Sequence, residues 1–389
     1  MKRQFLGFSA AAAVALASTA AAMAEPVKIG MVTTLSGGGS GLGIDVRDGF
    51  QLAVDQEGGT LGGHEIELIV SDDAREPDRA RQAADRMVER DGVDIMTGLI
   101  WSNLAIAVVP RVVREDVIYI SANAGPSILA GRNCHENYFN VAWQNDNLHE
   151  AAGQFVKDEG HDNVYMLAPN YPAGTDALEG FKRFYDGGIA GEVYTALGQQ
   201  DYAAELAALR NAEPDAVYIF LPGGMGISFI RQYEQAGLNE IIPLFGPAFS
   251  FSQDILGAAG EAALGVRNAS QWSKDLENPA NAAFVEDFIA AYDRLPSLYA
   301  SQGYDTARLI ASALEATGGN AADRDALREA LRAADFDSVR GAFRFGNNQH
   351  PIQDIYMREV VLEDGVVTNK VIGTAFEDHV DAYAQDCRM

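Results

Sequence analysis

The sequence has 389 residues, 48% of them hydrophobic, and its formal net charge is −26. This length and this apolar content are enough to bury the cores of two domains. A chain this acidic has no broad basic face, which argues against nucleic acid and anionic lipid as partners.

The first 24 residues are typical of a cleavable signal peptide. Lys2 and Arg3 form a positively charged start, an apolar run extends to about Ala22, and Ala-Met-Ala at 22–24 fits the small-x-small cleavage rule. A membrane anchor is the alternative, but the run is short and rich in alanine. No later stretch reaches the roughly 18 apolar residues that a membrane span needs. We therefore expect cleavage after Ala24 and export.

Only two cysteines occur, Cys134 and Cys387. In an exported chain, such a pair favours one disulfide, which would tie the last residues back to the first third of the chain. Two independent buried thiols are the alternative.

Strands alternate with helices in the first half of the chain. Apolar runs predict strands at 27–32, 65–70, 93–99 and 117–121. Helical spacing predicts helices around Phe50, Ala53 and Val54, over 78–90 after Pro77, and over 104–113.

The same order then repeats. Strands are predicted at 163–168, 192–197, 216–221 and 242–245. Helices are predicted around Leu178, Phe181 and Phe184 and over 202–210, 225–236, 280–295 and 301–317, followed by a hairpin of 355–361 and 366–372 around Asp364-Gly365.

The two halves predict an α/β protein with two doubly wound lobes, each built on a parallel sheet. "VDIMTGLIWSN" and "PDAVYIFLPGG" occupy matching places in them. Ligands of open α/β sheets bind at the carboxyl ends of the strands, so we expect a cleft where these ends face one another. No low-complexity linker separates the lobes, which indicates a hinge of several short crossings.

One strand-to-helix junction is a candidate anion site. Ser102 and Asn103 are good N-cap residues for the helix that follows, whose free backbone N–H groups and dipole favour a negative charge. A second junction runs from Ser121 through Asn123 to Gly125. Ordinary capped turns are the alternative for both junctions.

The motifs of common enzymes and cofactor sites are missing. The glycine loop at 37–43 has neither a Gly-Lys-Ser/Thr ending nor a G-x-G-x-x-G register, so no nucleotide is expected. Neither His135-Glu136 nor His149-Glu150 extends to H-E-x-x-H, and six histidines without a cysteine cluster predict no metal. Asp72-Asp73 could pair as acid and base, but a solvated strand end beside Arg75 is the simpler interpretation. We predict neither catalysis nor a cofactor.

Six segments together resemble the branched-chain amino-acid-binding branch of the type I periplasmic solute-binding proteins of ABC importers. They are "KIGMVTTLSGGGSGLG", "DGFQLAVDQEGGTLGG", "SDDAREPDRARQAADRMV", "VDIMTGLIWSN", "NYPAGTDALEGF" and "SQGYDTARLIASALEA". The resemblance covers residues 26–375 and implies two Rossmann-like lobes joined by a three-strand hinge. We expect lobe 1 at 25–142 plus 272–341, lobe 2 at 143–271 plus 342–375, and a tail at 376–389 returning to lobe 1.

The resemblance also implies ligand-binding positions. Ser102 matches the serine that holds a ligand carboxylate, Asn123 and Gly125 match the next loop, and Tyr171 matches a covering tyrosine. Gly125 stands where amino-acid binders carry threonine. Ala248 stands where they carry the acidic partner of the ligand's ammonium group. Because a buried ammonium without a carboxylate partner is costly, an α-amino acid fits poorly.

The residues that replace these groups are apolar or aromatic, which favours a flat, ring-bearing carboxylate of the benzoate or hydroxycinnamate type. "PNYPAGTDALEGF", "FLPGGMG" and the cysteine pair are similar to the aromatic-acid-binding subgroup. Core packing is the alternative role for Trp101 and Phe249. The candidate ligand-binding residues are Leu42, Trp101, Ser102, Asn103, Asn123, Ala124, Gly125, Tyr171, Pro222, Gly223, Ala248 and Phe249.

By this resemblance, we expect a monomeric periplasmic protein that closes its lobes over a small carboxylate and delivers it to a membrane permease. A branched-chain amino-acid or small-amide binder of the same transporter class is an alternative. A ligand-sensing protein for a signalling receptor is a second alternative, and an enzyme the weakest.

Overall fold

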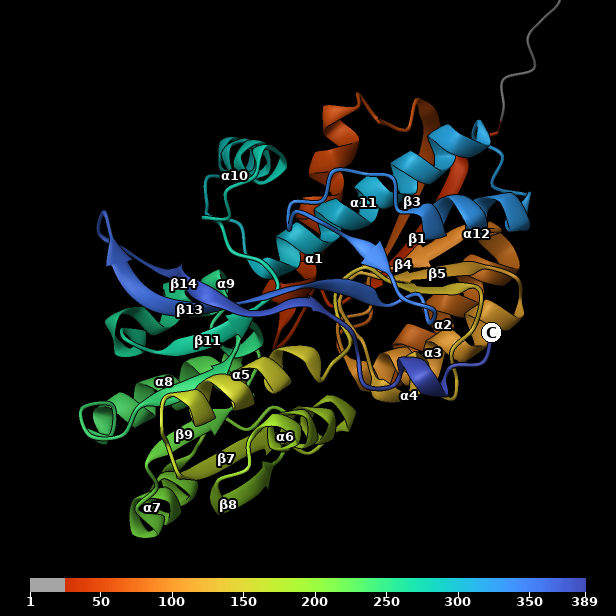
Figure 1. The fold of residues 1–389 in the computed structure, drawn as a ribbon. Coiled ribbons are helices and arrows are strands. Elements are labelled where there is room, and N and C mark those ends of the chain that lie inside the picture. Colours follow the sequence, from red (N-terminus) through yellow and green to blue (C-terminus); the bar gives the residue numbers. More distant parts are fainter. Residues whose placement is uncertain (1–24) are drawn as a thin grey trace, which may run out of the picture.

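A computed structural model describes residues 25–389, which form two β-sheets flanked by helices (Figure 1). The first sheet has the strand order β2-β3-β1-β4-β5-β6, with all pairs parallel except β2 with β3. Its strands are β1 (Val27–Thr33), β2 (Thr60–Leu61), β3 (His64–Asp72), β4 (Ile95–Thr97), β5 (Ile118–Ser121) and β6 (Tyr138–Asn140).

The second sheet has the order β12-β13-β11-β10-β9-β7-β8, and β14 pairs with β13. The strands from β7 to β11 run parallel, whereas β12, β13 and β14 join antiparallel. Its strands are β7 (Asn163–Pro169), β8 (Gly188–Thr195), β9 (Ala216–Ile219), β10 (Leu244–Pro247), β11 (Arg267–Ser270), β12 (Arg344–Phe345), β13 (Pro351–Glu363) and β14 (Val366–His379).

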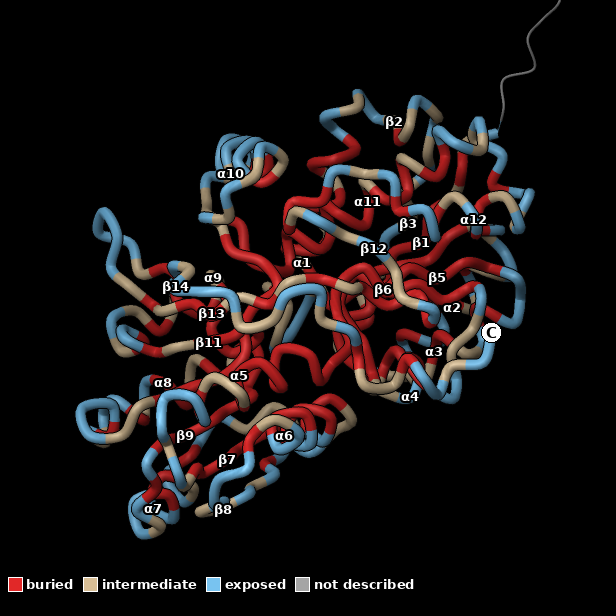
Figure 2. Tube along the Cα trace, viewed as in Figure 1, coloured by how far each residue is buried: buried red, intermediate tan, exposed pale blue. Residues whose placement is uncertain are grey.

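Helices cover each sheet, and we call each sheet with its helices a lobe. The first lobe carries α1 (Ser40–Gln56), α2 (Pro77–Arg86), the π-helical turn η1 (Met87–Asp91), α3 (Ser102–Arg114), α4 (Ser127–Ala130), α10 (Pro279–Tyr292), α11 (Leu298–Thr317) and α12 (Arg324–Ala333). The second carries α5 (Asn147–Asp158), α6 (Pro172–Phe184), α7 (Ala203–Ala212), α8 (Gly224–Gln235), α9 (Gln253–Ala259) and the 3₁₀ turns η2 (Ala248–Ser250) and η3 (Gly260–Ala263). A last 3₁₀ turn, η4 (Ala384–Asp386), lies near the C-terminus. In Figure 2 the buried segments follow the central strands of each sheet and the region where the lobes meet, whereas β3, β8 and β14 are mostly exposed or intermediate.

This architecture confirms the predicted fold class of two Rossmann-like lobes. The residue boundaries expected for the lobes stay a prediction. Two local expectations were wrong. Strand β8 begins four residues before the predicted 192, and the N-cap of α3 is Trp101 rather than Ser102 or Asn103. Trp101 takes the extended backbone of a cap, which makes Ser102 the first helical residue.

The predicted hairpin is present as β13 and β14. Its two-residue turn, Asp364-Gly365, has φ angles of 50° and 82°, the left-handed pair typical of a type I′ turn. The pairing of β13 with β14 shifts register between Gln353 and Arg358, so the hydrogen-bond ladder of the hairpin is irregular over these residues.

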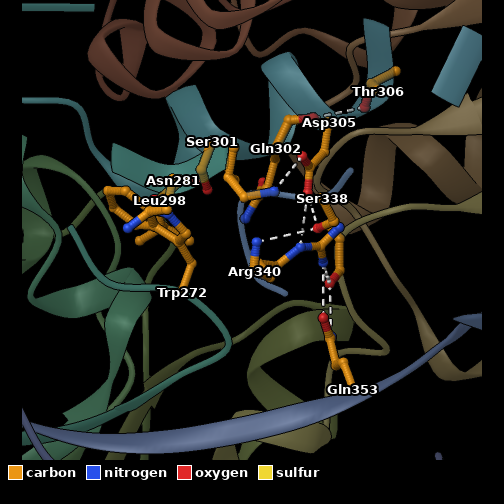
Figure 3. Close-up of polar contacts among 12 residues, drawn as sticks. Trp272, Asn281, Leu298, Ser301, Gln302, Asp305, Thr306, Ser338, Arg340 and Gln353 are labelled. Carbon is orange, nitrogen blue, oxygen red and sulfur yellow. Dashed lines mark hydrogen bonds and ion pairs between the residues drawn. The ribbon is translucent and has the colours of Figure 1, made fainter. Parts of the chain in front are cut away.

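The chain passes between the lobes three times: after β6, after β11 and before β12. A buried polar cluster joins these crossings (Figure 3). Arg340 Nε donates to Asp305 Oδ2 over 3.0 Å, and its Nη1 donates to the carbonyl of Ala142 and to Gln353. Arg358 Nη1 donates to the carbonyl of Trp272 in the second crossing. The crossings are therefore held to one another by charged hydrogen bonds.

The predicted disulfide between Cys134 and Cys387 is present, with the two Cα atoms 5.6 Å apart. It fixes the C-terminal tail to the segment after α4, so the tail returns to the first lobe (Figure 1). Among the helices in residues 25–389, none combines the length and the apolar character that a membrane crossing requires.

Candidate ligand-binding site

A cavity lies between the lobes, where the carboxyl ends of β4 and β5 face those of β7, β9 and β10. The space that atoms leave free in it, including the part that opens to solvent, is about 360 Å³. Loops from both lobes, the first crossing and the start of α11 line it. The lining residues are Leu42, Ile100, Trp101, Ser102, Asn123, Ala124, Trp143, Asn145, His149, Tyr171, Ala173, Phe220, Pro222, Phe249 and Tyr299.

Eight of the twelve predicted residues lie in this wall. They are Leu42, Trp101, Ser102, Asn123, Ala124, Tyr171, Pro222 and Phe249. Trp101 and Phe249 also belong to the buried core. Both interpretations, lining of the cleft and core packing, therefore fit these two residues.

The other four predicted residues do not line the cavity. Asn103 is the second helical residue of α3, and its side chain points about 100° around the helix axis from that of Ser102. A Cβ on Gly125 would lie only 2.1 Å from the carbonyl oxygen of Trp143, so no side chain fits there. Ala248 begins η2 and is fully buried, while its neighbour Phe249 reaches the cavity.

Gly223 makes a contact between the lobes instead. A Cβ there would lie 3.4 Å from the Cα of Gly39 and 3.5 Å from Cδ1 of Leu42, both in the first lobe. Its φ of 64° is also a conformation that favours glycine. Gly223 of the second lobe thus lies close to Gly39 and Leu42 of the first lobe at the edge of the cavity, so the two lobes meet there.

Ser102 offers several hydrogen-bond donors at one point of the wall. Its Oγ accepts a bond of 3.1 Å from Asn145 Nδ2, which leaves the hydroxyl hydrogen free to donate. The backbone N–H groups of Ser102 and Asn103 have no acceptor among residues 25–389. With the dipole of the 13-residue helix α3 behind them, these donors suit a carboxylate.

A hydrogen-bond chain connects Ser102 to the second lobe. Asn145 Nδ2 also donates to Asp176 Oδ2 over 2.8 Å, and Asp176 lies on α6 of the second lobe. Ser127, on α4 of the first lobe, donates to Asp176 through its Oγ over 2.7 Å and its backbone N–H over 3.1 Å. Asp176 is the carboxylate that holds the two lobes together beside the cavity.

Aromatic rings form the remaining walls. Tyr171 stacks on Phe220 with 11° between their planes, and the centroids of Trp101 and Tyr171 lie 6.3 Å apart. Trp143 meets Phe249 edge-on at 4.2 Å. Offset and edge-on arrangements of this kind are favourable between rings.

The charges at the site are few. None of the lining residues in the described chain is acidic. Burial lowers the pKa of His149 to about 3, so its imidazole is neutral near pH 7. Burial raises the pKa of Tyr171 far above its usual range, which keeps the phenol neutral.

Arg75 supplies a positive charge at the edge of the cleft. The Cζ atom of Arg75 lies 5.5 Å from the centre of the Trp101 ring. The guanidinium also lies against Gly198 of the second lobe, where a Cβ would be 3.1 Å from Nη2 of Arg75. It forms no ion pair with any carboxylate in residues 25–389.

Sequence reasoning missed Ile100, Trp143, Asn145, His149, Ala173, Phe220 and Tyr299 as lining residues. Trp143 and Asn145 belong to a crossing without a strand or helix pattern, and Tyr299 is far from Ser102 in the sequence. For Phe220, the signal was available, because it directly precedes the predicted strand-end residues at 221–222.

Comparisons with known proteins agree on one family. A family model described as periplasmic binding protein matches residues 26–365. The chain therefore belongs to the periplasmic binding protein family. Among solved structures, an ABC transporter solute-binding protein from R. palustris in complex with benzoate is 31% identical, with 94% of this chain and 100% of that chain covered and a TM-score of 0.88.

Two further relatives of this periplasmic binding protein differ in their described ligands. A solute-binding protein from Rhodopseudomonas palustris BisB5 in complex with 3,4-dihydroxybenzoic acid is 29% identical, covers 92% of this chain and 99% of its own, and has a TM-score of 0.84. The Leu/Ile/Val-binding protein homolog 6 of Brucella melitensis is 29% identical over 97% of this chain and 98% of its own. Members of the family are solute-binding proteins rather than enzymes, and this chain is the substrate-binding component of an ABC transporter.

Proposed function

We propose that this periplasmic binding protein captures an aromatic carboxylate in the cleft between its lobes and delivers it to a membrane permease. The observation that carries the proposal is the composition of the cavity wall. Aromatic rings line the cavity, the free donors at Ser102 suit a carboxylate, and no acidic side chain among the lining residues could pair with an ammonium group. The benzoate and dihydroxybenzoate complexes of the two solved relatives support this ligand class.

Closure of the lobes is the proposed mechanism of capture. The ligand first meets the donors of Ser102 on the first lobe, and the second lobe then brings Tyr171, Phe220 and Phe249 over the ring. A ligand drives closure only if it binds the closed form more tightly than the open form, and the second-lobe rings supply that difference.

Thermal melting of ligand-stripped protein tests the ligand class. The panel is leucine, an amide, benzoate, 4-hydroxybenzoate and 4-hydroxycinnamate. Ligand at 100 times its dissociation constant stabilises the folded form by about 2.7 kcal/mol, a rise of several degrees in melting temperature. We expect a rise with at least one aromatic acid and none with leucine. A rise with leucine alone would overturn the proposal.

A branched-chain amino acid is the second candidate ligand. The names of the curated relatives favour it, and Asn123 Oδ1 in the cavity wall is a buried acceptor without a partner among residues 25–389. An ammonium group could donate to this oxygen. The leucine sample of the panel decides between the two candidates.

We also propose that residues 1–24, which lie outside the described residues, are a signal peptide and that the working protein is periplasmic. Mass spectrometry of the protein secreted from a Gram-negative host should give Glu25 as the first residue. An intact N-terminus on the exported protein would contradict this.

A further inference from the structure

His149 is a polar group in the aromatic part of the cavity wall. It lies on α5 with 1% of its surface exposed. Its ring centroid is 5.1 Å from that of Phe220 and 5.9 Å from that of Phe249. It thus belongs to the second-lobe side of the cavity, whereas Ser102 belongs to the first-lobe side.

The hydrogen-bond partner of His149 determines which ring nitrogen carries the proton. Its Nδ1 makes a hydrogen bond with the hydroxyl of Tyr218, and no other partner of that hydroxyl exists in residues 25–389. Tyr218 is fully buried, and burial raises its pKa well above the usual value, so the phenol keeps its hydrogen. The phenol therefore donates to Nδ1. Because a neutral imidazole carries one hydrogen, that hydrogen is on Nε2.

The Nε2–H group is left without an acceptor. No hydrogen bond to Nε2 comes from the described chain, and the neighbouring rings Phe220 and Phe249 offer no acceptor. His149 lines the cavity, so a ligand that brings an oxygen to Nε2 gives this donor a partner among aromatic rings, where a hydrogen bond is stronger than in water.

We propose that Nε2–H of His149 selects aromatic carboxylates that carry a hydroxyl oxygen on the ring, remote from the carboxylate. This inference rests on the proposed function. Ser102 holds the carboxylate on one wall, and His149 on the facing wall donates to the ring oxygen. An unsubstituted ring fills the same space but leaves the Nε2–H group unpaired, so it binds more weakly.

Isothermal titration of ligand-stripped protein tests this selection. The probes are benzoate, 4-methylbenzoate, 3-hydroxybenzoate and 4-hydroxybenzoate. We expect one of the two hydroxybenzoates to bind at least tenfold more tightly than both benzoate and 4-methylbenzoate. In His149→Phe, the preference should fall to about twofold or less, because the donor is lost while an aromatic ring is kept.

Two further variants keep the test interpretable. His161→Phe replaces a histidine that packs on Phe245 and does not line the cavity, so it should leave all four affinities unchanged. If His149→Phe fails to fold, Tyr218→Phe removes only the hydroxyl that holds the tautomer, and it should weaken the preference with little effect on benzoate. A melting curve for each variant confirms that it is folded.

The outcomes separate this inference from the proposed function. Equal binding of all four aromatic acids to the wild-type protein, or an unchanged preference in His149→Phe, would overturn the role of His149 and leave the proposed function standing. Absence of binding by every aromatic acid would overturn both.

Discussion

The hydroxyl of Ser102 accepts its bond from Asn145 and keeps its hydrogen for a ligand. Removing it in Ser102→Ala should weaken benzoate-type ligands about 10- to 100-fold, since hydrogen bonds to charged groups contribute roughly 1.5–3 kcal/mol. Titration calorimetry measures the change. Ser312→Ala is the matched control, because that hydroxyl donates only to the carbonyl of Leu309 on the far side of α11. Equal affinities of Ser102→Ala and wild type would place the carboxylate elsewhere.

Arg75 carries a positive charge at the cleft edge of an acidic molecule, and no carboxylate within residues 25–389 pairs with it. We expect Arg75→Gln to slow the association of anionic ligands severalfold at low salt, and the difference to shrink as salt screens the charge. Stopped-flow tryptophan fluorescence can follow binding, because Trp101 and Trp143 line the cavity. Arg79→Gln removes the same charge from an exposed position of α2 and should leave the rate nearly unchanged. A salt-independent loss in Arg75→Gln would point to a packing role instead.

Asp176 on helix α6 accepts hydrogen bonds from Ser127 on helix α4. Because Ser127 and Asn145 both donate to Asp176, replacing it in Asp176→Ala should shift the lobes toward the open form and weaken ligand binding. Small-angle X-ray scattering should show a larger radius of gyration without ligand than in the wild type. Asp186→Ala removes a carboxylate that pairs with Lys157 inside the second lobe, so it is the control for general destabilisation. A closed ligand-free Asp176→Ala protein would contradict this role.

Strands and helices with a clear hydrophobic pattern could be predicted from the sequence, and short or polar strands could not. The strands β1, β5 and β7 follow apolar runs, but β6 has only three residues, and β11 reads Arg-Asn-Ala-Ser. The same limit applies to the site. Ser102 and Tyr171 sit at the ends of predicted strands, whereas Asn145 and His149 become lining residues only through the path of the first crossing and the packing of α5 against the second sheet. The close contact of Gly125 with Trp143 depends on tertiary packing, so the sequence could not show it.

On the scale of the whole molecule, two carboxylates from different lobes lie close to each other. Asp45 of α1 and Asp254 of α9 line one groove, where Arg294 Nη1 lies 2.7 Å from Asp45 Oδ1. Asp48, Ser297 and Tyr299 also lie close by. Burial, and then the charge of Asp254, raise the pKa of Asp45 to about 7 despite Arg294.

Closure should therefore depend on pH. A carboxyl whose pKa is higher in the closed form binds its proton more tightly there, so closure is favoured as the pH falls below 7 and disfavoured as it rises through 7. Ligand affinity should be severalfold higher at pH 6 than at pH 8, and this ratio should be smaller in Asp254→Asn. Titration calorimetry at both pH values measures it. A wild-type affinity that rises with pH would contradict the predicted direction of the pH dependence.

The disulfide should stabilise the folded protein without changing its affinity for the ligand. It closes a loop across a sequence separation of 253 residues, for which loop entropy gives about 5 kcal/mol as an upper value. The double variant Cys134→Ser, Cys387→Ser should melt several degrees lower and bind with unchanged affinity, because neither cysteine lines the cavity. Calorimetry of both proteins, without and with ligand, measures the two quantities. A weaker affinity in the double variant would show that the tail influences closure.

The three crossings also determine how the molecule responds to a protease. Each lobe is assembled from segments that are separated in the chain, since the second sheet takes β7 to β11 from one segment and β12 to β14 from another. A single cut in any one crossing leaves the other two intact, and the disulfide still holds the tail. The nicked protein would keep its hydrodynamic size under native conditions, and its fragments would separate only on a denaturing gel.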